Sequence, residues 1–187
     1  MRQRIWTISN FLSLSRILLM APVVFLFLAQ SPHHREFSVL LVLLAVTTDA
    51  LDGYFARLFH QESEVGRIID PLADKIDVGI IVVLLVIFGD IPLWFALLVL
   101  IRDIAIFAGG VYIKRRKGIV LPSIMAGKFA VSFVALTLTF AMLRYRMFDL
   151  AEEISLIVST ALLVVSFGLY VRRFVSVLSS SNGGPKG

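Results

Sequence analysis

The sequence predicts an all-α, polytopic membrane protein with six transmembrane helices, and three observations support this. First, 58% of the 187 residues are hydrophobic and the mean hydropathy is +0.91, which is too apolar for a soluble domain. Second, the apolar residues gather in long runs separated by short polar segments. Third, each run supplies about 20 residues, enough for a helix to cross a hydrocarbon core of about 30 Å.

The first three spans follow a short basic lead-in whose Trp6 suits the headgroup layer. These spans are predicted at residues 9–29, 37–58 and 66–88, with polar connections at 30–36 and 59–65. Pro71 falls inside the first turns of the third span. Since proline removes a backbone donor and disfavours helix before it, the helix either begins at Pro71 or kinks there.

The last three spans begin after Gly89-Asp90-Ile91-Pro92, which predicts a tight turn. They are predicted at residues 92–113, 122–143 and 154–174, with a basic loop at 114–118 and a polar loop at 144–153. We expect residues 1–178 to form a single six-helix catalytic domain. The Ser/Gly-rich residues 179–187 are expected to be a disordered tail.

The distribution of Lys and Arg predicts the orientation in the membrane. One side would receive Arg2, Arg4, Arg57, Arg67, Lys114, Arg115, Arg116, Lys117, Arg172 and Arg173, and the other Arg35, Arg144 and Arg146. Both termini and the stretch 49–74 are therefore expected on the cytoplasmic side of the membrane. The net charge of +5 suits anionic headgroups and phosphates rather than nucleic acid, because the basic residues flank apolar spans.

Four carboxylates stand where the second and third spans meet: Asp49, Asp52, Asp70 and Asp74. On a helix, the first two lie about 60° apart and the last two about 40° apart, so each pair shares a face. Carboxylates near membrane depth are costly and indicate function. If the two helices run antiparallel, the pairs can face each other and form an all-oxygen site for Mg²⁺ or Mn²⁺. Two such cations suit phosphoryl-type chemistry.

Residues 49–74 match the signature D-x2-D-G-x2-A-R-x8-G-x3-D-x3-D at all eight fixed positions. This stretch resembles the CDP-alcohol phosphotransferase family of integral membrane enzymes, also called class I CDP-alcohol phosphatidyltransferases. The resemblance implies transfer of a phosphatidyl group from CDP-diacylglycerol to an alcohol, with release of CMP. It also implies two divalent cations held by the four aspartates, Asp74 as general base, and a homodimer.

The same resemblance implies a nucleotide site. Gly53, Ala56, Arg57 and Gly66 match positions associated with cytidine, and the pattern Asn10-x2-Ser13-x2-Arg16 resembles a polar motif of the first span. Glycine admits close approach, and Arg57 offers a fork for phosphate. Arg16 has a simpler alternative, in which it reaches the interface along its apolar stem.

The acceptor is harder to predict. Arg102 and Lys128 are cations within apolar spans, where each is expensive unless it meets an anion. One interpretation is a basic pocket for an acceptor phosphate, with Lys75 and Arg116 as helpers. The alternative is that Arg102 simply pairs with Asp103 or with the aspartate cluster.

Within the family, two subgroups compete. Residues 70–75 (DPLADK), the short N-terminus and the six spans resemble bacterial phosphatidylglycerophosphate synthases, whose acceptor is glycerol 3-phosphate. This resemblance implies a bacterial cytoplasmic membrane as the location. The pair Arg102-Asp103, followed by a basic loop and Pro122-Ser-x3-Gly-Lys, is similar to the cardiolipin synthases, whose acceptor is phosphatidylglycerol. A cation transporter is the rival class, although it predicts carboxylates spread over more spans. Transfer to glycerol 3-phosphate is the preferred prediction.

Overall fold

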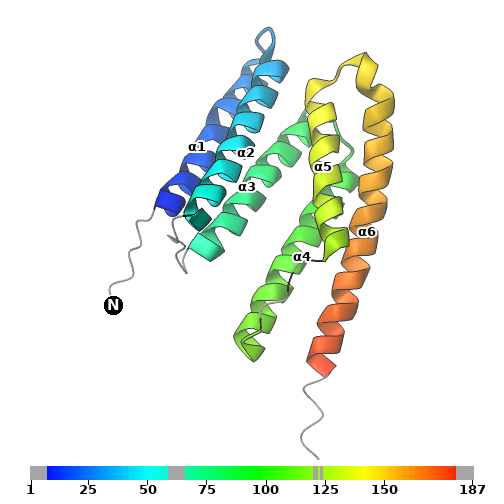
Figure 1. Cartoon of the computed structure of the whole chain (residues 1–187). Helices are drawn as coiled ribbons and strands as arrows, with labels where there is room; N and C mark the ends of the chain where they lie inside the picture. The colour runs from blue at the N-terminus through cyan, green and yellow to red at the C-terminus, as the bar shows by residue number, and fades with distance from the viewer. Residues whose placement is uncertain (1–7, 59–65, 120–121, 123, 180–187) are drawn as a thin grey trace, which may run out of the picture. The chain divides into compact units, whose positions relative to one another are not determined.

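The computed structural model describes the backbone of residues 8–58, 66–119, 122 and 124–179, and the side chains within 18–48, 74–119, 122 and 124–179. These residues are helical apart from short connections (Figure 1). The helices are α1 (Ile8–Ala29), α2 (His34–Leu58), α3 (Gly66–Ile87), α4 (Leu93–Lys117), α5 (Met125–Leu143), a 3₁₀ turn η1 (Arg146–Phe148) and α6 (Asp149–Ser179). The all-α prediction is confirmed.

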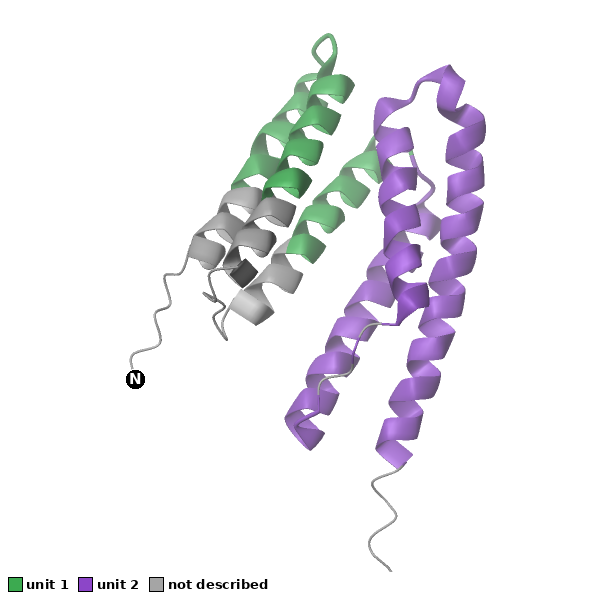
Figure 2. Cartoon of the chain, viewed as in Figure 1, with its two compact units in different colours: residues 1–90 green, residues 91–187 purple. Residues whose placement is uncertain are grey.

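The chain divides into two compact units, residues 1–90 and 91–187 (Figure 2). The first holds α1 to α3 and the second holds α4 to α6. The single catalytic domain expected from the sequence stays a prediction.

In the first unit, α1 packs against both α2 and α3. The buried α1 residues Met20, Val23 and Phe27 recur at helical spacing and supply the centre of the contact. Polar groups fasten the end of the unit where α1 meets α2. Arg35 at the start of α2 donates from Nη1 and Nη2 to the two carboxylate oxygens of Asp90, at 3.0 and 3.1 Å. The Asp90 side chain is fully buried, so this ion pair joins the start of α2 to the residues after α3.

In the second unit, α5 and α6 form a hairpin through η1, and α4 packs on α6 (Figure 1). The buried face of α6 is unusual because it carries Ser155, Ser159 and Ser166 around Leu163. Small residues let helix backbones approach closely, which is a common way for helices to associate in lipid. The hydroxyls of Ser159 and Thr137, 3.3 Å apart, connect α6 to α5.

The contact between α4 and α6 depends on a second small residue. A Cβ on Gly109 would lie 3.2 Å from the Tyr170 hydroxyl and 3.3 Å from the Phe174 ring. The Tyr170 hydroxyl donates to the backbone carbonyl of Ile106 at 2.9 Å. Near the ends of both helices, the Lys117 ammonium donates to the carbonyl of Val177. Bonds from side chain to backbone therefore hold α4 on α6 along its C-terminal half.

Three helical segments in the described part of the chain are long and apolar enough to cross a membrane: Leu93–Lys117, Met125–Leu143 and Arg146–Ser179. Leu18–Ala29 is a shorter apolar segment. The protein is thus an integral membrane protein, and the figure of six spans remains a prediction.

Two predicted loops are wrong. Lys114–Lys117 form the last turn of α4, and Gly118 ends the helix with φ 67°. Lysine and arginine are good helix formers, and their charge suits a helix C-terminus. Within the predicted loop 144–153, η1 occupies 146–148 and α6 already begins at Asp149, with Asp149 and Glu152 in its first turn. Acidic residues suit a helix N-terminus, which explains why α6 begins before the predicted span 154–174. The helix also continues past residue 174, to Ser179.

The third helix settles one alternative. Because α3 runs from Gly66 to Ile87, the interpretation in which the regular helix begins at Pro71 is wrong. Pro71 is the sixth residue of α3, just past the four N–H groups that have no helical acceptor, so it costs the helix one backbone hydrogen bond near its start. The tail beyond Ser179 lies outside the described residues, so its predicted disorder is not addressed by the structure.

Candidate active site

The predicted metal ligands lie on two consecutive helices of the first unit. Asp49 and Asp52 fall in the last ten residues of α2, and Asp70 and Asp74 in the first nine residues of α3. The two helices run in opposite directions (Figure 1). In an antiparallel pair, the end of the first helix and the start of the second share one end of the bundle, which is the arrangement that the site requires.

The side chains of Asp49, Asp52 and Asp70 lie outside the described residues, and Asp74 is exposed. Among the side chains that are described, no group of three His, Cys, Asp or Glu residues could hold a metal. The chemistry of the predicted ligands nevertheless fits a hard divalent cation, since all are carboxylates. The continuous helix through Pro71 also fits a metal site, because it keeps Asp70 and Asp74 on one face of α3.

The predicted nucleotide residues are spread over all three helices of this unit. Asn10, Ser13 and Arg16 belong to the start of α1, whereas Gly53, Ala56 and Arg57 belong to the end of α2. Gly66 is the first residue of α3. Their surroundings lie outside the described residues, so the nucleotide site stays a prediction.

Asp77 is a carboxylate that the sequence analysis missed. It lies three residues after Asp74 and seven after Asp70, so the three residues share one stripe of α3. Asp77 is half-buried, its Oδ1 is fully buried, and the stripe continues into buried Ile81. The i, i+4, i+7 spacing of Asp70, Asp74 and Asp77 is the signal that indicates it, whereas the family signature ends at Asp74.

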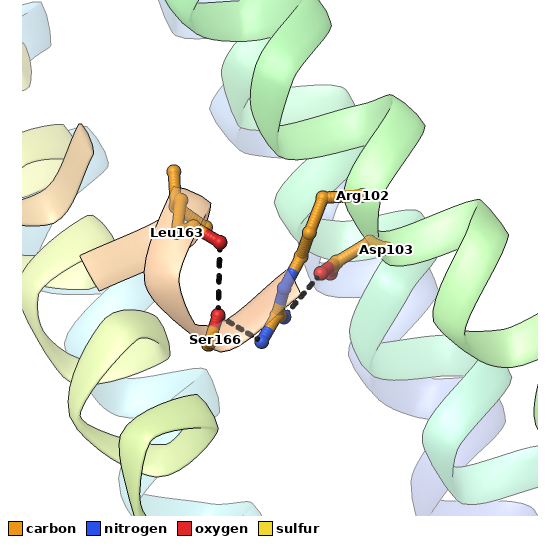
Figure 3. A network of polar contacts seen from close by, with 4 residues as sticks. All are labelled: Arg102, Asp103, Leu163 and Ser166. Carbon is orange, nitrogen blue, oxygen red and sulfur yellow. Dashed lines mark hydrogen bonds and ion pairs between the residues drawn. The ribbon is translucent and has the colours of Figure 1, made fainter. Parts of the chain in front are cut away.

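Arg102 is the centre of a network of polar contacts in the second unit (Figure 3). Only 6% of its surface is exposed. Its Nη1 donates to Oδ1 of the neighbouring Asp103 at 2.7 Å, and its Nη2 donates to Oγ of Ser166 on α6 at 3.2 Å. Of the two alternatives for Arg102, pairing with Asp103 is therefore present. This pairing leaves Nε buried without a hydrogen-bond partner among the described residues.

The start of α5 lies beside this guanidinium. A Cβ on Gly127 would stand 3.4 Å from Nη2 of Arg102. The next residue, Lys128, is exposed. The structure thus brings Gly127 to Arg102, which the sequence motif did not specify.

The other two predicted acceptor residues have different surroundings. Arg116 is exposed on the last turn of α4 and donates from Nη1 to the Tyr112 hydroxyl at 2.5 Å. Lys75 belongs to α3 in the first unit and is half-buried.

Comparison with known proteins decides the family. The profile described as CDP-alcohol phosphatidyltransferase matches residues 6–171, which include the four aspartates, Arg102 and Lys128. The chain belongs to this family. It is therefore a transferase of phospholipid biosynthesis, and the membership favours an enzyme over a cation transporter.

Individual relatives are similar to the transferase over much of its length. A protein of Aquifex aeolicus named CDP-diacylglycerol–glycerol-3-phosphate 3-phosphatidyltransferase is 40% identical over 134 residues, 70% of this chain and 72% of the relative. A Rickettsia bellii protein of the same name is 35% identical over 50% of this chain and 52% of its own length. A Mycobacterium tuberculosis protein named putative cardiolipin synthase is 32% identical over 69% of this chain and 61% of its own length.

Proposed function

We propose that the transferase moves the phosphatidyl group of CDP-diacylglycerol to glycerol 3-phosphate and releases CMP. One observation carries this choice of acceptor: the Aquifex relative with that name is 40% identical over 72% of its length. The complete aspartate signature, from Asp49 to Asp74, supports the chemistry. The reaction takes place at the cytoplasmic face of the membrane, where a soluble phosphorylated acceptor is available, and the enzyme acts as a homodimer.

The reaction is one displacement at phosphorus. The acceptor hydroxyl oxygen forms a bond to the phosphorus that carries diacylglycerol, while the bond from that phosphorus to the bridging oxygen breaks and CMP leaves. Asp74 takes the proton of the attacking hydroxyl. An ionised carboxylate is a weak base, so the position of Asp74 against the hydroxyl must supply much of its effect.

All four aspartates of the signature, Asp74 included, are assigned to the metal cofactor. Asp49, Asp52, Asp70 and Asp74 are the proposed ligands of two divalent cations, Mg²⁺ or Mn²⁺. When bound, such cations polarise the attacked phosphate and stabilise the charge on the departing CMP. The protein brings four carboxylates to one end of α2 and α3. These carboxylates repel one another unless cations neutralise them.

The donor is held by small and basic residues. Gly53, Ala56 and Gly66 leave room for the cytidine nucleotide on α2 and α3, and Arg57 pairs with its phosphates. Asn10, Ser13 and Arg16 at the start of α1 add polar contacts to the same nucleotide. The diacyl chains stay in the lipid.

The acceptor phosphate is assigned to Arg102 and Lys128, with Lys75 and Arg116 as helpers. Arg102 supports this assignment best, because it is a buried cation with an unused Nε–H. Asp103 pairs with Nη1, so a phosphate would serve as the acceptor that Nε–H lacks among the described residues.

A second candidate acceptor is phosphatidylglycerol. The sequence pair Arg102-Asp103 and the Mycobacterium relative named putative cardiolipin synthase, 32% identical over 61% of its length, favour it. The two candidates differ in the attacking alcohol and share the donor, the leaving group and the metal site.

An acceptor screen tests the proposal. The purified protein in detergent micelles with CDP-diacylglycerol and Mg²⁺ is given glycerol 3-phosphate, phosphatidylglycerol, serine or inositol phosphate, and CMP release is measured against a reaction without acceptor. We expect glycerol 3-phosphate to give the highest turnover. Faster CMP release with phosphatidylglycerol would make phosphatidylglycerol the acceptor in place of glycerol 3-phosphate. No CMP release with any of the four alcohols would overturn the proposal.

A further inference from the structure

The environment of the Arg102 guanidinium contains a polar residue that the proposed function leaves out. Ser166 lies on α6, is fully buried, and accepts a hydrogen bond from Nη2 of Arg102 at 3.2 Å (Figure 3). The same hydroxyl donates to the carbonyl of Leu163 at 3.0 Å. A hydroxyl has one hydrogen, so its donation to Leu163 leaves a lone pair for Arg102. The chain of bonds therefore runs in one direction, from Arg102 through Ser166 to Leu163.

This chain of bonds limits how the guanidinium can move. Asp103 holds Nη1 at 2.7 Å, and Ser166 holds Nη2 from the neighbouring helix. The guanidinium is planar, so fixing two of its nitrogen atoms sets the direction of the third. The third, Nε, is buried and has no hydrogen-bond partner within the described residues. A buried N–H group without an acceptor costs desolvation free energy, which an acceptor at Nε would recover.

The surroundings favour an anion as the missing partner. The start of α5 stands beside the guanidinium, since a Cβ on Gly127 would lie 3.4 Å from Nη2. The N-terminal end of a helix carries partial positive charge. No described side chain caps the start of α5, although the amides of Gly127 and Lys128 donate to the carbonyl of Ile124. Asp103 already balances the charge of Arg102. The observation that favours a phosphate is the buried Nε–H, for which a phosphate oxygen is a strong acceptor.

We propose that Ser166 is a positioning residue of the acceptor site. Together with Asp103, it orients Arg102 so that its Nε–H faces the phosphate of the acceptor. The inference rests on the proposed function, because it takes the assignment of Arg102 to the acceptor from there. It adds a residue on α6 that no motif in the sequence indicates.

The experiment compares two serine-to-alanine variants of the whole enzyme. Ser166→Ala removes the contact with Arg102. Ser155→Ala is the matched control, because Ser155 is also buried on α6 and also donates to a carbonyl three residues earlier, that of Glu152 at 2.9 Å. The measured quantities are kcat, the KM for glycerol 3-phosphate, the KM for CDP-diacylglycerol, and the melting temperature.

We expect Ser166→Ala to raise the KM for glycerol 3-phosphate about tenfold, since it removes one hydrogen bond to a charged group. The KM for CDP-diacylglycerol should stay within about twofold, and Ser155→Ala should leave both KM values near wild type. Ser166→Thr keeps the hydroxyl and should restore most of the acceptor affinity. If Ser166→Ala folds poorly, Ser166→Cys takes its place, because it keeps the size and is a weak acceptor.

An unchanged KM for glycerol 3-phosphate in well-folded Ser166→Ala would overturn the inference. Equal changes in both KM values, or the same change in Ser155→Ala, would also overturn it, because they would indicate a packing role only. If wild type prefers phosphatidylglycerol, the proposed acceptor fails by itself. In that case the role of Ser166 is tested by comparing the KM for phosphatidylglycerol among wild type, Ser166→Ala and Ser155→Ala.

Discussion

Asp74 connects the described structure to the proposed chemistry, since its side chain is exposed on α3 while the other three aspartates lie outside the described side chains. Asp74→Asn keeps the size of the side chain but removes the basic oxygen. We expect transfer to fall by about 10²-fold to 10⁴-fold, the usual contribution of a general base. CMP release measures this, with circular dichroism in micelles as the check on folding. A variant with near-normal turnover would remove Asp74 from the role of base.

The oxygen-only ligand set leads to a prediction about metals. We expect EDTA to abolish CMP release and added Mg²⁺ or Mn²⁺ to restore it, because carboxylates bind these hard cations well. Dialysis into metal-free buffer followed by titration of each cation gives the measurement. Full activity in the presence of the chelator would contradict the metal site.

At the scale of the helices, the pair Arg35–Asp90 is the strongest polar link in the first unit. Its two bonds, at 3.0 and 3.1 Å, involve a fully buried carboxylate, and Arg35 also lies 5.7 Å from the centre of the Phe27 ring. We expect Arg35→Ala or Asp90→Ala to destabilise the fold by about 3–5 kcal/mol, because each removes one partner of an ion pair with a buried carboxylate.

A double-mutant cycle separates that cost from packing. The double variant should be less destabilised than the sum of the two single variants, because it leaves no buried charge alone. Thermal unfolding in micelles measures all four proteins. Strictly additive losses would show that the pair contributes nothing as a pair.

Two glycines permit a matched test of the contact between α4 and α6. A Cβ on Gly109 would meet the Tyr170 hydroxyl at 3.2 Å, whereas a Cβ on Gly168 would meet nothing within 4 Å. Gly168→Ala should stabilise by roughly 0.5–1 kcal/mol, since alanine loses less backbone entropy in a helix. Gly109→Ala should instead destabilise by about 1 kcal/mol through crowding. The same melting-temperature shift for both variants would contradict this packing.

For the whole molecule, the testable property is orientation in the membrane. The chain has no cysteine, so a single introduced cysteine is the only site for a thiol reagent. Lys114→Cys and Arg146→Cys occupy exposed positions that the charge bias assigns to opposite sides. In intact cells, an impermeant maleimide should label position 146 and reach position 114 only after permeabilisation. Labelling in the reverse pattern would invert the topology.

Much of this protein could be predicted from its sequence because the relevant signals are local. Long apolar runs need only their own length to predict helices, and the eight motif positions from Asp49 to Asp74 need only their spacing. The family followed from that motif, and the match over residues 6–171 confirmed it. The ends of helices were predicted less well. Charged residues led us to place loops at 114–118 and 144–153, yet lysine and arginine extend α4 and acidic residues begin α6.

The contacts between helices required the tertiary structure. Arg102 and Ser166 are 64 residues apart, as are Ile106 and Tyr170, and Arg35 and Asp90 are separated by 55. No periodicity within one helix indicates which face of another helix it meets, because that choice depends on the packing of all side chains between them. The sequence thus identified Arg102 as a costly buried cation. Only the packing of α6 against α4 places the hydroxyl of Ser166 beside Arg102. In that packing, Nε–H of Arg102 has no acceptor among the described residues.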